Sequence, residues 1–308
     1  MPLPLGPVRL LGLSPRRLAV GYALALTAAT FFGIGGIIAK LAFRAGLDPS
    51  QLAELRIIFS FLLLFAVLAA LRPHDLVVRR ADLPLLALFG VVGIGGVQLS
   101  YYEAIQRLPI GVALVIQYTA PLLLLLYARL TGKRVDARLW LAAVLTIAGC
   151  ALVVGLYDES LRAVNTVGAL LAILSAVIFA VYFTLAERVL AIYRPWTALV
   201  YGLGFALVAW AIVRPVWLLP WDLAATNWPL IAGIAVLTVI PFALTLAAVS
   251  LIPAARVGLT STFEPVVAAL AAFFVLSEAL EPPQLLGGAV VLAGIVIAQS
   301  LRLRAGGV

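Results

Sequence analysis

The residues that could do chemistry in this chain are a small set of polar side chains inside long apolar stretches. Gln98 is three residues from Tyr101 and four from Tyr102, so these side chains share one face of a helix. Amides and hydroxyls can bind the polar head of a small molecule, while aromatic rings contact its apolar part. The other candidates for substrate binding lie in three further apolar stretches: Gln117, Tyr118, Ser175, Tyr182, Ser261 and Thr262.

These polar side chains have a second interpretation, in which they only form hydrogen bonds between neighbouring helices. Gln98 and Gln117 are the stronger candidates for a binding site, because an amide is difficult to satisfy in an apolar bundle. Gln117 and Tyr118 also align with Ser261 and Thr262 at a constant offset of 144 residues.

Two charged residues are candidates for charge or proton coupling. Arg56 follows Glu54 early in an apolar stretch, and it either extends to the membrane interface or points inward at a substrate carboxylate. Glu264 stands beside Pro265 and is the most deeply placed acid, which makes it the candidate for proton coupling. The alternative role of Glu264 is to pair with a neighbouring helix.

A glycine motif occurs twice, as Gly33-Ile34-Gly35-Gly36 and as Gly93-Ile94-Gly95-Gly96. A nucleotide-binding loop would need a strand–turn–helix context, whereas both copies lie inside long apolar stretches. Small residues allow helices to pack closely, and they could also let a helix bend as a gate moves. Prolines could also let a helix bend, because a proline leaves one intrahelical hydrogen bond unmade. The candidate bending positions are Gly33, Gly36, Gly93, Gly96, Pro121 and Pro265.

The composition places these residues in a membrane protein. The chain is 65% hydrophobic and 11% charged, whereas soluble domains are roughly half apolar and a quarter charged. We expect an all-α polytopic membrane protein, because helices satisfy their own backbone hydrogen bonds in lipid. Ten transmembrane helices are predicted near residues 18–43, 51–71, 83–105, 110–130, 137–156, 166–189, 196–214, 228–250, 255–276 and 283–301.

The basic residues predict the orientation. Fifteen of the 21 lysines and arginines fall on the side of the N-terminus, five fall on the other side, and Arg56 lies within a span. Positive charge is retained in the cytoplasm. We therefore expect a multi-pass protein of the cell (inner) membrane with both termini cytoplasmic.

Two pairs of prolines indicate an internal repeat. Pro109 and Pro253, like Pro121 and Pro265, are 144 residues apart. We expect two five-helix repeats, at 18–156 and 166–301, joined by an external loop at 157–165 and flanked by cytoplasmic tails at 1–17 and 302–308. An odd number of spans inverts the second repeat, and inverted repeats are typical of alternating-access transporters whose substrate binds between the halves.

The residues around these prolines carry a family resemblance. Ala104-Ile105-Gln106-Arg107-Leu108-Pro109 leads into Gln117-Tyr118-Thr119-Ala120-Pro121, and Ala248-Val249-Ser250-Leu251-Ile252-Pro253 leads into Phe263-Glu264-Pro265. With Leu276-Ser277-Glu278-Ala279-Leu280, the chain resembles the drug/metabolite transporter superfamily and its ten-helix, duplicated (EamA-like) family. The resemblance implies export of small metabolites, including amino acids, and the aromatic content is similar to that of the aromatic amino-acid exporter branch. Gly132-Lys133 departs from the Gly-Glu that often follows span four in the family.

These observations favour a secondary transporter that exports small amphipathic metabolites, most of all amino acids. Export of drugs, cationic compounds, sugars or nucleotides on the same fold is the alternative. An intramembrane enzyme is disfavoured, because His74 is the sole histidine and lies in a polar loop. A channel would need a polar ring or filter motif. We expect no catalytic residue, cofactor, metal or nucleic-acid partner, and a monomer or homodimer that contacts its substrate and the lipid bilayer.

Overall fold

The computed structural model describes residues 15–158, 165–277 and 279–300, and these are helical almost throughout. The first half contains α1 (Pro15–Arg44), α2 (Pro49–Leu71), α3 (Leu83–Leu88), α4 (Val97–Ile105), α5 (Ile110–Gln117), α6 (Ala120–Leu130) and α7 (Ala137–Val153). The second half contains α8 (Thr166–Leu190), α9 (Pro195–Val213), α10 (Trp221–Thr226), α11 (Trp228–Val249), α12 (Ala254–Ser261), α13 (Glu264–Leu276) and α14 (Pro282–Ser300). A π-helical segment, Phe89–Gly96, joins α3 to α4.

The described helices form an all-α membrane bundle, as the sequence predicts. Nine helical segments of this part of the chain are long and apolar enough to cross a bilayer, and α7 adds an apolar helix of 17 residues. Large apolar side chains such as Leu62, Phe65, Leu170 and Ile212 are exposed on the outside of the bundle. Lipid solvates these side chains, so their exposure carries no hydrophobic penalty in a membrane.

Two predicted spans are interrupted at the same point of the repeat. The expected span at 110–130 consists of α5 and α6, and the expected span at 255–276 consists of α12 and α13. Both α5 and α12 begin after a proline and have eight residues, so the two breaks are 144 residues apart. Pro121 and Pro265 stand in the first turn of the following helix, where the missing N–H of proline ends the preceding hydrogen-bond ladder.

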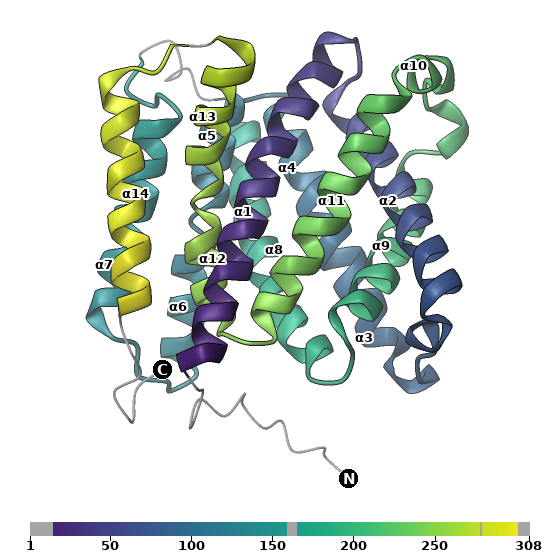
Figure 1. Ribbon diagram of the computed structural model, residues 1–308, viewed down its shortest axis with the longest axis horizontal. Helices are drawn as coiled ribbons and strands as arrows, with labels where there is room; N and C mark the ends of the chain where they lie inside the picture. The colour runs from purple at the N-terminus through teal and green to yellow at the C-terminus, as the bar shows by residue number, and fades with distance from the viewer. Residues whose placement is uncertain (1–14, 159–164, 278, 301–308) are drawn as a thin grey trace.

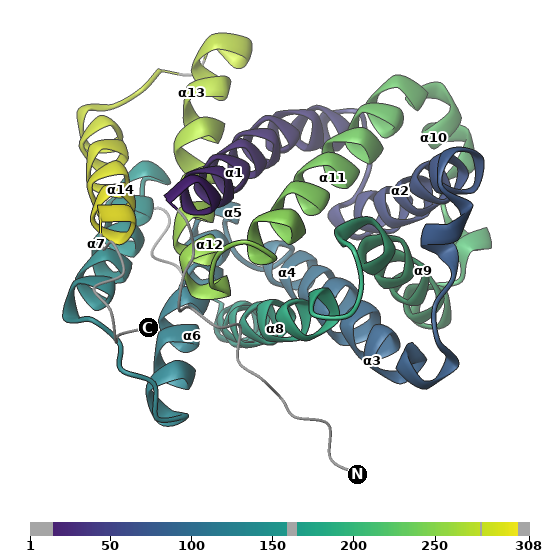
Figure 2. The same cartoon turned by 60° about the horizontal axis from the view of Figure 1, so that its bottom comes forward.

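The packing of the helices also repeats between the halves. Helix α4 of the first half packs against α8 of the second, and correspondingly α11 of the second half packs against α1 of the first. The last helices of the two halves, α7 and α14, pack directly on each other at one side of the bundle (Figure 2). The start of α1 and the end of α14 lie at the same end of the molecule, which we call the terminal end (Figure 1).

Glycines set the spacing between α7 and α14. A Cβ built on Gly149 would lie 2.7 Å from the carbonyl oxygen of Gly287, and one built on Gly287 would lie 2.7 Å from that of Gly149. Real Cβ atoms do not approach a backbone oxygen so closely, so each position accepts only glycine at this helix spacing. The fifth span of each half is thereby held to its counterpart.

Candidate functional site

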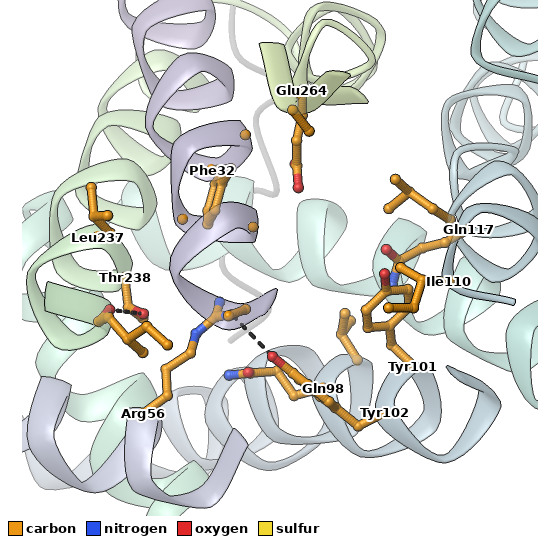
Figure 3. Close-up of a pocket in the computed structure, with 18 of the residues that line it drawn as sticks. Phe32, Arg56, Gln98, Tyr101, Tyr102, Ile110, Gln117, Leu237, Thr238 and Glu264 are labelled. Atoms are coloured by element: carbon orange, nitrogen blue, oxygen red, sulfur yellow. Dashed lines mark hydrogen bonds between the residues drawn. The ribbon is translucent and has the colours of Figure 1, made fainter. Parts of the chain in front are cut away.

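A cavity of about 420 Å³ lies between the two halves of the bundle. Helices of both halves line it: α1, α2, α4 and α5 come from the first half, and α8, α11, α12 and α13 come from the second. Its wall is largely apolar, with a few polar side chains pointing inward (Figure 3). The polar and charged lining residues are Lys40, Arg56, Gln98, Tyr101, Tyr102, Gln117, Tyr182, Thr238, Thr245, Ser261 and Glu264.

The cavity extends away from the terminal end of the bundle. Lys40 and Phe43, which line it, stand in the last turns of α1, far from the start of that helix. Ile105 and Ile110 line it at the connection between α4 and α5, two helices that meet at the same distal end.

The terminal end is closed by polar contacts between helices. Arg256 donates a hydrogen bond to the hydroxyl of Tyr22 at 2.9 Å, which joins α12 to α1. Glu187 of α8 accepts a hydrogen bond from the backbone N–H of Ala254 at 2.9 Å and so caps the first turn of α12. A Cβ on Gly21 would lie 2.7 Å from the side chain of Ile252, which shows how closely α1 approaches this region.

Gln98 is the polar residue whose burial most needs an explanation. The residue is 5% exposed and borders the cavity, yet neither its amide nitrogen nor its amide oxygen has a hydrogen-bond partner. An unsatisfied buried polar group costs roughly 1–3 kcal/mol. The hydroxyl of Tyr182, also at the cavity, is likewise buried without a partner. The described residues therefore supply no hydrogen-bond partner to these polar atoms at the cavity wall.

Arg56 points into the cavity rather than out to the membrane interface (Figure 3). Its guanidinium donates to the hydroxyl of Tyr102 at 3.3 Å and lies 5.8 Å from the ring centre of Phe242. Its Nε is buried and has no partner. Glu54, two residues earlier, turns elsewhere and lies 3.7 Å from Arg214. The two charges, which are two residues apart in the sequence, thus point to different surroundings.

The remaining polar candidates split into residues that line the cavity and residues that stand behind its wall. Gln117 lines it and donates to the hydroxyl of Ser175 at 2.7 Å, so Ser175 supports Gln117 from the opposite half. Tyr118 stands behind the wall and donates to Glu264 at 2.8 Å. Thr262 also lies outside the lining and donates to the carbonyl of its own helix at Leu259.

The repeat is visible in this division. Gln117 and Ser261, which are 144 residues apart, both line the cavity, whereas Tyr118 and Thr262, with the same offset, both lie behind it. The helices α5 and α12 are therefore turned about their axes in the same way, so that equivalent residues of the two halves line the cavity.

The candidate bending positions have unequal surroundings. Around Gly36 nothing lies within 4 Å of a built Cβ, whereas at Gly33 the Cβ would be 2.8 Å from the carbonyl oxygen of Glu264. Gly93 lies against Tyr182, and Gly96 against Ile178, both at 3.4 Å. Gly33 therefore permits a close approach of α1 to α13, while Gly36 leaves space at the cavity wall.

The phenylalanines of the cavity's aromatic wall, Phe32, Phe179 and Phe242, were absent from the sequence-based candidates, which did include Tyr182. Phe32 and Phe242 meet edge-to-face with ring centres 5.2 Å apart, and Phe179 stacks on Tyr182 at 5.9 Å. All four line the cavity. Phenylalanine is common in lipid-facing and core positions alike, so its residue type carries no signal, although Phe242 does follow Pro241 inside α11.

An all-helical bundle of two related halves around a cavity of mixed polarity defines a membrane transporter. The chain belongs to the EamA-like transporter family, which matches it twice, over residues 19–155 and 166–299.

Individual relatives agree with this assignment. The chain is 30% identical over 266 residues to an uncharacterized transporter of Archaeoglobus fulgidus, a match covering 85% of this chain and 91% of the relative. It is 30% identical over 222 residues to the threonine/homoserine exporter RhtA of Escherichia coli K12, covering 70% and 71%. A crystal structure superposes with a TM-score of 0.72 at 19% identity, covering 91% of this chain and 98% of that one, which supports the fold.

Proposed function

We propose that this transporter exports amino acids by alternating access, with the cavity between the halves as the substrate site. The observation that carries the proposal is Gln98, a residue that lines the cavity and whose two amide atoms are buried without a hydrogen-bond partner. A zwitterionic head group offers both acceptors and donors to such an amide. The phenyl rings of Phe32 and Phe242 would contact the apolar part of the substrate.

The distribution of contacts along the bundle supports a two-state carrier. The cavity extends toward the end away from the termini, while contacts such as Arg256–Tyr22 close the terminal end. With both termini cytoplasmic, as the charge distribution predicts, this arrangement corresponds to an outward-facing state. Inverted repeats exchange conformations between their halves, so the opposite arrangement is accessible to the same chain.

The domain boundaries proposed for this mechanism are repeats at 18–156 and 166–301 with a connecting loop at 157–165. The loop begins after α7, and residues 159–164, together with the tails at 1–14 and 301–308, lie outside the described residues. The name of the related exporter RhtA specifies threonine and homoserine. Because aromatic rings line the cavity, we extend the proposal to amino acids with larger apolar side chains.

Counterflow into vesicles containing purified protein tests the proposal. Labelled threonine and labelled phenylalanine should accumulate saturably in vesicles preloaded with the unlabelled amino acid. Empty vesicles supply the background, and an Arg107→Gln variant serves as a control for an exposed side chain outside the cavity. Counterflow of sugars, nucleotides or cationic drugs, with none of any amino acid, would refute the substrate class while leaving the transporter fold intact.

A further inference from the structure

Two opposite charges face the cavity from different halves of the molecule. Arg56 comes from α2 and Glu264 from the first turn of α13, and both point inward from separate walls (Figure 3). No ion pair joins them among the described residues. Charges removed from water are costly unless a partner compensates them. The space between these two charges is therefore suited to a ligand that carries both signs.

The wall around Arg56 is a set of hydrogen-bond donors. Its Nε is buried and unpaired, and its terminal nitrogen makes only a long contact of 3.3 Å to Tyr102. The unpaired amide nitrogen of Gln98 borders the same wall. A guanidinium presents a fork of N–H groups that matches the two oxygens of a carboxylate.

The wall around Glu264 is a set of acceptors. Tyr118 donates to Oε2 of Glu264, which fixes the carboxylate and leaves Oε1 for another donor. Gln117 stands on the neighbouring helix with its nitrogen engaged by Ser175, so its amide oxygen is the atom that remains to accept a hydrogen bond. An ammonium group has three donors and no acceptor, and this wall complements it.

We infer that Arg56 and Gln98 bind the carboxylate of an α-amino acid while Glu264 binds its ammonium group, so that the substrate bridges the two halves. This inference rests on the proposed function and adds the orientation of the substrate and the basis of selection. A zwitterion satisfies both walls, whereas a cationic drug leaves Arg56 uncompensated and a sugar leaves both charges uncompensated. Lys40 lines the distal part of the cavity and is the rival cation for the carboxylate.

The test combines protein variants that lack the charge of Arg56 or of Glu264 with threonine derivatives that lack the charge of the carboxylate or of the ammonium group. Purified wild type, Arg56→Gln and Glu264→Gln would be assayed for binding of threonine, threonine methyl ester and N-acetylthreonine by thermal stabilisation, which grows with ligand concentration over Kd. We expect wild type to bind threonine at least about tenfold more tightly than either analogue. Arg56→Gln should bind threonine no better than the methyl ester, and Glu264→Gln should bind it no better than N-acetylthreonine.

Matched variants separate the possible outcomes. Arg56→Lys should recover part of the preference over the methyl ester, which also shows that position 56 can be altered in a folded protein. The inference is overturned if each variant weakens all three ligands equally, or if Lys40→Gln rather than Arg56→Gln abolishes the preference over the methyl ester. If wild type binds and transports no amino acid, the proposed function itself fails. If wild type binds threonine but Arg56→Gln does not lose the preference over the methyl ester and Glu264→Gln does not lose the preference over N-acetylthreonine, only the substrate orientation is overturned.

Discussion

The guanidinium of Arg256 on α12 donates a hydrogen bond to the hydroxyl of Tyr22 on α1 at 2.9 Å, across 234 residues of sequence. The same hydroxyl donates to the carbonyl of Ala298 on α14 at 3.4 Å, so three helices meet at the terminal end. The position equivalent to Arg256 in the first half, 144 residues earlier, is Val112. The repeat therefore provides this polar contact at one end only.

This asymmetry predicts that Tyr22→Phe loosens the terminal end. A hydrogen bond to a charged group contributes about 1.5–3 kcal/mol, so its loss should shift the population toward opening at this end. The readout is a reactive cysteine at the cavity, where Leu237 is one of the lining residues. Leu237→Cys in a Cys150→Ala background would be modified by a membrane-impermeant thiol reagent from the terminal side. The rate should rise several-fold, with Tyr127→Phe, an exposed tyrosine, as the control. An unchanged rate would mean that Arg256–Tyr22 does not restrict opening.

Gln98→Leu should separate stability from binding. Because both polar atoms of Gln98 are buried without partners, replacing the amide by an apolar group of similar size removes the free-energy cost of burying an unpaired polar group. We expect the thermal midpoint without substrate to be unchanged or raised, while affinity for threonine falls at least about tenfold. Gln284→Leu is the matched control and should lower the midpoint, since its amide donates to the carbonyl of Val153 at 3.0 Å. A lower midpoint for Gln98→Leu would contradict the idea that its amide is reserved for a ligand.

The bond between Gln117 and Ser175 predicts coupling between the halves. Gln117→Ala leaves the hydroxyl of Ser175 without its donor, at a cost of roughly 1–3 kcal/mol. Thermal unfolding of Gln117→Ala, Ser175→Ala and the double variant forms a double-mutant cycle, and the two losses should be non-additive by about 0.5–3 kcal/mol. Gln117→Ala should also weaken threonine binding more than Ser175→Ala does, because only Gln117 borders the cavity. Additive stabilities, or equal effects on binding, would count against this assignment.

Gly149→Ala should destabilise the contact between α7 and α14. The added methyl would lie 2.7 Å from the carbonyl oxygen of Gly287, and overpacking of this kind costs about 1–3 kcal/mol. The measurement is the thermal midpoint of the purified variant. Gly233→Ala is the control, since its nearest neighbour would be a flexible side-chain end at 3.4 Å. Equal midpoints for the two variants would show that the helices separate without strain.

Reporter fusions test the orientation. A reporter that is active only outside the cytoplasm should be inactive when fused after Val308 and active when inserted after Asp158, because basic residues are concentrated on the side of the termini. A protein-domain reporter that folds only in the cytoplasm should give the opposite pattern. An active external reporter at Val308 would reverse the assignment of the cavity as outward-facing.

The sequence by itself determined the apolar spans, the internal repeat and the set of polar residues that are candidates for the binding site. Prolines such as Pro109 and Pro253 are chemically unable to continue a helical hydrogen-bond ladder, so their positions and the 144-residue offset already indicate where helices begin. Gln98 and Gln117 were predictable as cavity residues because a buried amide needs partners that an apolar bundle rarely supplies.

Only the tertiary structure decided which of these polar candidates line the cavity. Tyr118 and Gln117 are adjacent in sequence, yet one stands behind the wall and the other lines it, because packing fixes how far each helix is rotated about its axis. The alternatives for Arg56 were equally compatible with the sequence until α2 was placed beside Phe242 of the other half. Phenylalanine contacts lipid, the protein core and a substrate through the same dispersion and hydrophobic forces. Which phenylalanines form the aromatic wall of the cavity therefore depends on which helices the fold brings together.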